Sequence, residues 1–69
     1  MNSYEITYYL DDHLSVSELV EAGSQEEAFE MIRKEGIITL IDESLETRTM
    51  CRFHADSVKL ATVQIKSTN

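Results

Sequence analysis

One segment of the chain, residues 24–35, has the periodicity of an α-helix. It begins with Ser24 at an N-cap position and Glu27 three residues later, a capping box in which hydroxyl and carboxylate each satisfy a backbone N–H group. Apolar side chains then recur at helical spacing, and Gly36 follows at the position where many helices end in a left-handed residue. We therefore expect one helix, over residues 24–35, and the rest of the fold must pack around it.

Ahead of this segment, apolar and polar residues alternate with a period of two, which is typical of β-strands. The alternation runs over residues 4–10 and again over residues 14–22. Residues 11–13 separate the two runs, and their aspartates favour turn geometry because the carboxylate can bond nearby backbone N–H groups. The pattern predicts a β-hairpin.

Three further strands are predicted after the helix. Residues 37–41 are apolar and β-branched on both faces, which favours a central strand covered on two sides. Residues 42–46 then form a polar turn, and residues 47–53 alternate again. A second turn at 54–57 leads to a last strand over 58–66.

The order of segments is therefore ββαβββ. This order predicts an α+β fold in which one helix packs on a largely antiparallel sheet of four to five strands. The 69 residues form a single domain, 1–69, and the lone Cys51 excludes a disulfide within the chain. Because a domain of about 60 residues buries only roughly 60% of its unfolded surface, stability depends on a well-packed core or on association.

Part of such a sheet has no helix to cover it. A helix of about twelve residues is roughly 18 Å long and covers about three strands spaced about 4.8 Å apart. Tyr9, Leu19 and Met50 are expected on the uncovered side, where an exposed apolar face favours self-association as a homodimer. The alternative is that these are scattered surface residues, which need no partner.

Composition excludes several classes of protein. The longest apolar run is far shorter than the roughly 18–20 residues of a membrane helix, and the first residues lack the basic and apolar regions of a signal peptide. A single cysteine without a secretion signal favours a reducing, cytoplasmic location. The formal net charge of −7, from 13 acidic and 6 basic residues, argues against direct binding to nucleic acid.

Motifs for catalysis or metal binding are weak. Cys51 and His54 have a Cys-x-x-His spacing, but a zinc site needs further ligands that the sequence does not supply. Asp12, His13 and Ser15 are the residue types of an acyl-transfer triad, yet neighbours on one turn do not form its geometry and no oxyanion loop is evident. We therefore predict no enzymatic activity, no cofactor and no metal site.

The charge is distributed unevenly along the chain. Residues 1–46 carry twelve acidic and two basic side chains, a formal charge of −10, whereas residues 47–69 carry one acidic and four basic, a charge of +3. One interpretation is an acidic surface that docks on a basic partner, because arginine sites built for phosphate also accept carboxylate. The other is a solvated face that keeps a small protein in solution. The candidate surface residues are Asp11, Asp12, Glu18, Glu21, Glu26, Glu27, Glu30, Asp42, Glu43 and Glu46.

The size, the acidic run and the segment VEAGSQEEAFEMIRKEGIITLID at residues 20–42 give the chain a resemblance. It resembles the small acidic proteins that phages and prophages encode to block host machinery, including anti-CRISPR proteins and other nucleic-acid mimics. The resemblance is one of architecture and assigns no site residue. The basic last strands depart from a pure mimic, and they are expected to serve self-association or to contact an acidic part of the target or its nucleic acid.

Two functions follow as hypotheses. The first is a non-enzymatic inhibitor in the bacterial cytoplasm, whose acidic face occupies the basic nucleic-acid channel of a host nuclease such as a CRISPR effector. The second is a homodimeric adaptor or structural accessory protein, which pairs through its uncovered sheet face and edge strand.

Overall fold

The α+β class and the ββαβββ order are confirmed by a computed structural model, which describes residues 1–42 and 48–67. Five strands, one α-helix and one turn of 3₁₀-helix follow one another along the chain. They are β1 (Asn2–Asp11), β2 (Leu14–Ala22), α1 (Gln25–Glu30), β3 (Ile37–Asp42), β4 (Thr49–His54), η1 (Ala55–Ser57) and β5 (Leu60–Ser67).

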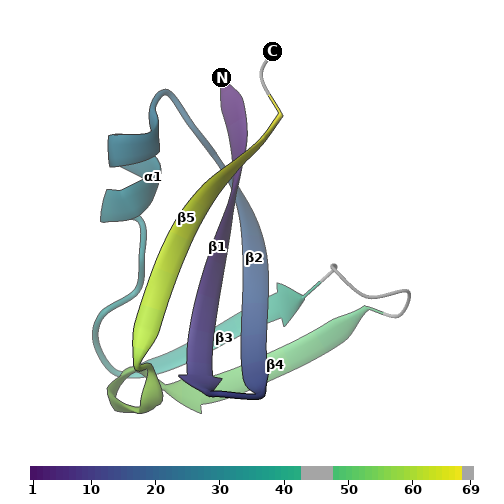
Figure 1. Cartoon of the computed structure of the whole chain (residues 1–69), viewed down its shortest axis with the longest axis vertical. Coiled ribbons are helices and arrows are strands. Elements are labelled where there is room, and N and C mark those ends of the chain that lie inside the picture. The colour runs from purple at the N-terminus through teal and green to yellow at the C-terminus, as the bar shows by residue number, and fades with distance from the viewer. Residues whose placement is uncertain (43–47, 68–69) are drawn as a thin grey trace.

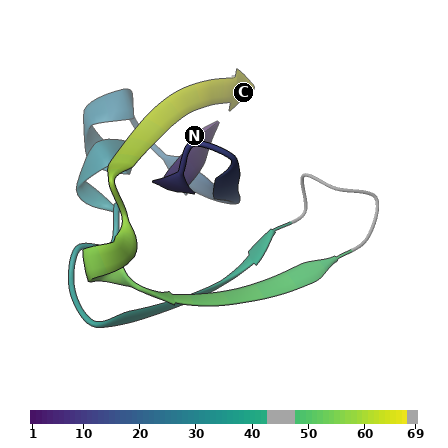
Figure 2. The ribbon, with the colours of Figure 1, turned by 60° about the horizontal axis from the view of Figure 1, so that its bottom comes forward.

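The strands lie in two antiparallel sheets, where the sequence predicts one. The first sheet has three strands in the order β2-β1-β5, and the second contains only β3 and β4. In Figure 1, β1, β2 and β5 run side by side, and the β3–β4 ribbon crosses their lower ends. Figure 2 shows the ribbon and α1 in relation to the three-stranded sheet, with η1 leading from β4 into β5.

The first hairpin forms as its sequence predicts. The backbone N–H of His13 donates to the Asp11 carboxylate at 2.7 Å, so the aspartate side chain closes the turn. The register between β1 and β2 pairs Asp11 with Leu14 and then shifts by one residue before the Tyr9–Ser15 pair. This irregularity leaves Leu10 without a partner in β2.

The core lies on one face of the three-stranded sheet and is closed by two different elements. Ile6 and Tyr8 of β1 pack with Ile38 and Leu40 of the ribbon. Nearer the start of β1, Tyr4 packs with Ala22 and with Ala28 of the helix, and Val20 and Val63 contact both groups. Helix and ribbon therefore divide one face of the sheet between them.

The prediction that residues 37–41 form a strand covered on both faces is wrong. Along β3, Ile37 is 62% exposed whereas Ile38 is 1% exposed, and Leu40 is buried again. The strand pairs only with β4 in the described part of the chain, and only one face of the ribbon packs on the three-stranded sheet. A short apolar run does not reveal this difference, because the outward isoleucines look the same in the sequence as the inward ones.

The helix is half as long as predicted. Ser24 is the N-cap, and its hydroxyl accepts from the Glu27 N–H at 3.1 Å, which confirms the predicted start. The helix ends at Glu30 rather than Glu35, and Met31 and Ile32 donate to carbonyls three residues back. Beyond this turn, the Arg33 N–H donates to the Tyr8 hydroxyl at 3.1 Å rather than to a helix carbonyl.

Gly36 enters β3 with a φ of +73°, the left-handed region that other residues adopt at a cost. A Cβ added there meets nothing within 4 Å, so the cost of Gly36→Ala comes from the backbone alone. We expect this substitution to lower the free energy of unfolding by about 1–2 kcal/mol, measured by urea denaturation.

Gly23→Ala is the matched control. Its added Cβ meets a carboxylate oxygen of Glu27 at 3.1 Å, the far end of a flexible side chain that can move. Equal losses of stability in the two variants would contradict the assignment of strain to Gly36.

Candidate functional site

Four exposed carboxylates lie on α1 and on the end of β2 that precedes it. Glu26, Glu27 and Glu30 are exposed on α1, and Glu21 is exposed near the end of β2. The ion pairs within the described residues are Arg33 with Glu18 and Lys66 with Glu5, so none of the four carboxylates has a cationic partner there. We call Glu21, Glu26, Glu27 and Glu30 the acidic pole.

An exposed aromatic ring lies within the acidic pole. Phe29 is 52% exposed and lines a shallow depression of about 420 Å³ together with Glu26, Glu30 and Val63. Gln25 also lines it and donates from its amide to the Val63 carbonyl at 3.1 Å, which fixes the helix against β5. The pole thus combines uncompensated negative charge with apolar area.

Asp11 and Asp12 form a second and separate acidic region. They lie at the turn between β1 and β2, at the opposite end of these strands from α1 (Figure 1). Both residues are exposed, although the Asp11 carboxylate already accepts from the His13 N–H. The single acidic surface expected from the sequence is therefore divided between the two ends of the sheet.

Two of the predicted surface acids point into the structure instead. The Glu18 side chain is only 11% exposed; one of its oxygens accepts from the Tyr8 hydroxyl at 2.9 Å, and the other lies 3.5 Å from the Arg33 guanidinium. Asp42 is 5% exposed and accepts from the Ser17 N–H at 3.1 Å. Glu43 and Glu46 lie outside the described residues.

The Tyr8 hydroxyl connects three parts of the chain. It donates to Glu18 of β2 and accepts from the Arg33 N–H after the helix, while the Arg33 guanidinium donates to the Thr39 carbonyl of β3 at 2.8 Å. Its ring packs against Phe53, with 5.6 Å between centroids. Burial, assisted by the bond to Glu18, raises the pKa of Tyr8 from 10.0 to about 12.

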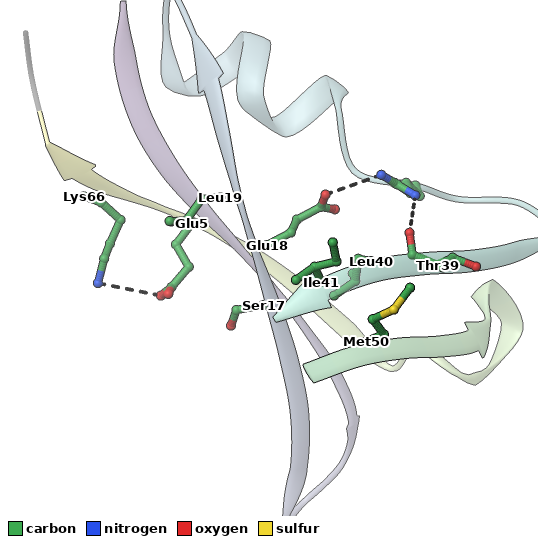
Figure 3. A pocket seen from close by; sticks show the side chains of 10 residues that line it. Glu5, Ser17, Glu18, Leu19, Thr39, Leu40, Ile41, Met50 and Lys66 are labelled. Carbon is green, nitrogen blue, oxygen red and sulfur yellow. Dashed lines mark hydrogen bonds and ion pairs between the residues drawn. The ribbon is translucent and has the colours of Figure 1, made fainter. Parts of the chain in front are cut away.

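A cleft of about 660 Å³ lies between the edge of β2 and the ribbon. Figure 3 shows side chains of both sheets around it, with the Glu18–Arg33 and Glu5–Lys66 ion pairs drawn as dashed lines. Leu19 and Met50 both line the cleft and are 57% and 73% exposed. Tyr9, the third residue predicted for self-association, is 38% exposed and does not line the cleft.

The Cys51 and His54 pair is not assembled as a site. Cys51 is a half-buried free thiol that contacts the core, whereas His54 is exposed at the end of β4. No group of three or more potential ligands in the described part of the chain could hold a metal ion. Among the same residues, no helix is long and apolar enough to cross a membrane.

Compared with protein-family models, with curated proteins and with solved structures, the chain matches none of them.

Sequence reasoning missed both the bonds of Tyr8 and the cleft, and one residue signalled the bonds. In the alternating run 14–22, Glu18 falls on the same face as Val16 and Val20, where an acidic residue needs a buried partner. The cleft had no such signal, because it depends on the separation of the two sheets.

Replacing Tyr8 with phenylalanine tests these bonds. Tyr8→Phe leaves the Glu18 carboxylate without its hydroxyl donor and the Arg33 N–H without its acceptor. We expect a loss of about 1–3 kcal/mol in the free energy of unfolding. Tyr4→Phe is the control, since its hydroxyl accepts one bond from Asn2 at 3.2 Å, and it should cost less than about 1 kcal/mol.

The same pair of variants should respond differently to alkaline pH. The pKa of Tyr8 is raised in the folded state to about 12, so the folded protein retains this proton where the unfolded chain loses it. The contribution is fully present below pH 10 and declines as the pH rises from 10 to 12. Wild type and Tyr4→Phe should therefore lose more stability over this interval than Tyr8→Phe, and parallel curves would contradict the assignment.

Proposed function

We propose that this chain is a non-enzymatic acidic binding protein whose acidic pole occupies a basic nucleic-acid-binding site on another protein. The observation that carries the proposal is the group of exposed carboxylates around Phe29, which have no cationic partner among the described residues. The mode of action is competition: the bound pole excludes the nucleic acid from its site.

The chemistry of the pole suits such a target. Guanidinium groups that bind phosphate also bind carboxylate in a bidentate manner, so arginines lining a nucleic-acid channel can pair with Glu26 and Glu30. These residues lie one helical turn apart, where side chains on a helix surface are neighbours. The negative field also steers association with a basic surface, and this steering weakens as salt is added.

Phe29 supplies what a purely charged surface lacks. Exposed ion pairs contribute little each, whereas the binding energy of interfaces is concentrated in a few aromatic and arginine residues. A ring that is 52% exposed beside Glu26 and Glu30 can pack against the partner while the carboxylates pair around it. Charge then governs the rate of encounter, and burial of the ring governs dissociation.

The most concrete partner is a CRISPR effector in a bacterial cytoplasm, with the chain acting as a phage-encoded inhibitor. Such effectors read a short duplex flank with arginine side chains, which a group of carboxylates can engage. The size and acidic character of the chain, as in small phage inhibitors, also support this role.

A displacement assay tests the proposal. Guide-loaded type I and type II effectors are incubated with fluorescent target DNA, and the chain is added while anisotropy is followed. We expect displacement of DNA by the wild type, at least tenfold weaker displacement by Glu26→Gln/Glu27→Gln/Glu30→Gln, and weaker displacement at higher salt, because the carboxylates compete for phosphate-binding arginines.

Asp11→Asn/Asp12→Asn/Glu35→Gln is the matched control, because it removes three negative charges away from the pole. It should displace DNA nearly as well as the wild type. An equal loss of DNA displacement in both triple variants would show an effect of net charge alone. If the chain displaces DNA from none of the effectors, the proposed function is wrong.

One observation favours a second candidate, a homodimeric adaptor. Leu19 and Met50 expose apolar area in the same cleft, beside the outer edge of β2. If the chain self-associates there, sedimentation equilibrium should give a salt-insensitive dimer that Leu19→Lys/Met50→Lys dissociates. Tyr9→Lys is the control, since Tyr9 lies outside the cleft, and a monomer at all concentrations would exclude this candidate.

A further inference from the structure

The edge of β2 that faces the cleft carries backbone groups with no strand beside them. In the sheet order β2-β1-β5, β2 is a terminal strand and pairs only with β1. The Ser17 N–H points away from β1, because it donates to Asp42 of the ribbon. Groups that point outward recur at every second residue of a strand, so Leu19 and Glu21 also present their N–H and C=O groups to this side.

The facing edge of β3 is arranged in the same way. The Thr39 carbonyl points away from β4, since it accepts from the Arg33 guanidinium. By the same alternation, Ile41 presents its backbone groups outward, while Leu40 pairs with Cys51 of β4. Two strand edges therefore border one cleft.

Two side chains of the chain itself form hydrogen bonds with backbone groups of these edges. Asp42 binds the Ser17 N–H and closes one end of the β2 edge, and Arg33 binds the Thr39 carbonyl. The backbone hydrogen bonds outside the regular helices and strands include none between β2 and β3 in the described residues. The outward backbone groups of β2 at Leu19 therefore have no strand beside them in the described residues.

The side chains of the cleft indicate what fits it. Leu19, Ile41 and Met50 provide apolar area. The cations are the more accessible charges, because the side chains of Arg33 and Lys66 are 48% and 49% exposed, whereas those of their partners Glu18 and Glu5 are 11% and 19% exposed. On a chain with net charge −7, this cleft exposes positive charge beside apolar surface.

We propose that the cleft receives an extended peptide segment of a partner protein, which adds as a strand beside β2 at Leu19. Main-chain hydrogen bonds to the open edge supply affinity, and alternate side chains supply selectivity. Side chains on the Leu19 face are apolar, and those on the opposite face include a carboxylate that reaches Arg33. The inference is independent of the proposed inhibitor role, because it rests on the β2 edge at Leu19 and on a partner of opposite charge, and it competes with the homodimer for the same cleft.

A peptide fits this cleft better than a second copy of the chain. Pairing β2 with β2 of another copy brings together two strands that each carry two carboxylates and no basic residue, which is unfavourable between like-charged molecules. The second copy would also bring its own ribbon, which lies beside the same edge. A volume of about 660 Å³ is that of a small-ligand site and suits a few residues of one extended chain.

A titration with defined peptides tests the proposal. The probe is the capped peptide acetyl-VDVDV-amide, and the charge-reversed control is acetyl-VKVKV-amide. We expect the acidic probe to shift the ¹⁵N-labelled Leu19 amide and protect it from hydrogen exchange, with at least tenfold stronger binding than the control. Failure of the acidic probe to perturb the Leu19 amide at millimolar concentration, or equal binding of both peptides, would overturn the inference.

N-methylated probes distinguish strand addition from adsorption to an apolar surface. Alternate residues of an added strand turn their N–H groups toward β2. Methylating the backbone nitrogens of the valines and methylating those of the aspartates should therefore change the affinity unequally. One set should lose at least tenfold in affinity while the other binds as the parent peptide does. Equal effects of the two sets would contradict pairing with β2.

A variant of the protein provides the complementary test. Leu19→Pro removes the outward N–H without breaking the β1–β2 ladder, as is tolerated in edge strands, and should weaken the acidic probe at least tenfold. Leu19→Thr keeps the N–H and is the matched control. If the Leu19 amide is instead protected from hydrogen exchange without peptide, and this protection increases with protein concentration, a second copy of the chain occupies the edge. That result would contradict the proposal.

Discussion

The buried hydroxyl of Tyr8 determines how the parts of this fold fit together. A phenol at this depth needs hydrogen-bond partners, and it takes one from β2 and one from the segment after the helix. The Arg33 backbone is bonded there three residues after α1 ends, and its guanidinium donates to the Thr39 carbonyl of β3. One tyrosine hydroxyl therefore ties together β1, β2 and the segment that leads from α1 to the ribbon.

Local signals predicted the local structure well. The hairpin turn at Asp11, the N-cap at Ser24 and the positions of five strands follow from side-chain chemistry within a few residues. The failures all involve distant contacts. Nothing near Glu35 shows that the helix ends early, and the hydrogen bond that the Arg33 N–H makes instead goes to a tyrosine 25 residues earlier. The sheet order likewise depends on which strands meet in space. Residues 37–41 alternate between buried and exposed because β3 pairs with β4 in a second sheet that packs on the first through one face only.

The candidate site was predicted in composition but not in arrangement. The acids of α1 are exposed as expected, whereas Glu18 accepts from the Tyr8 hydroxyl within the first sheet and Asp42 accepts from the Ser17 N–H between the two sheets. Summing charge along a sequence does not separate these roles, because only burial distinguishes a solvated carboxylate from one with a structural partner. The exposed carboxylates of α1 lie at one end of the sheet (Figure 1), whereas the exposed cations Arg33 and Lys66 line the cleft (Figure 3). The two surfaces can therefore be altered independently.

The pairing of β1 with β5 has a consequence for how the chain acquires its structure. Tyr4 of β1 lies opposite Ile65 of β5, so the central strand gains its second neighbour only after β5 has been synthesised. Until then, the apolar face of β1 and β2 lacks Val63 and Ala61. Contacts so distant in sequence slow the folding of small domains. The newly made chain should consequently be more sensitive to proteases and to aggregation than the finished fold.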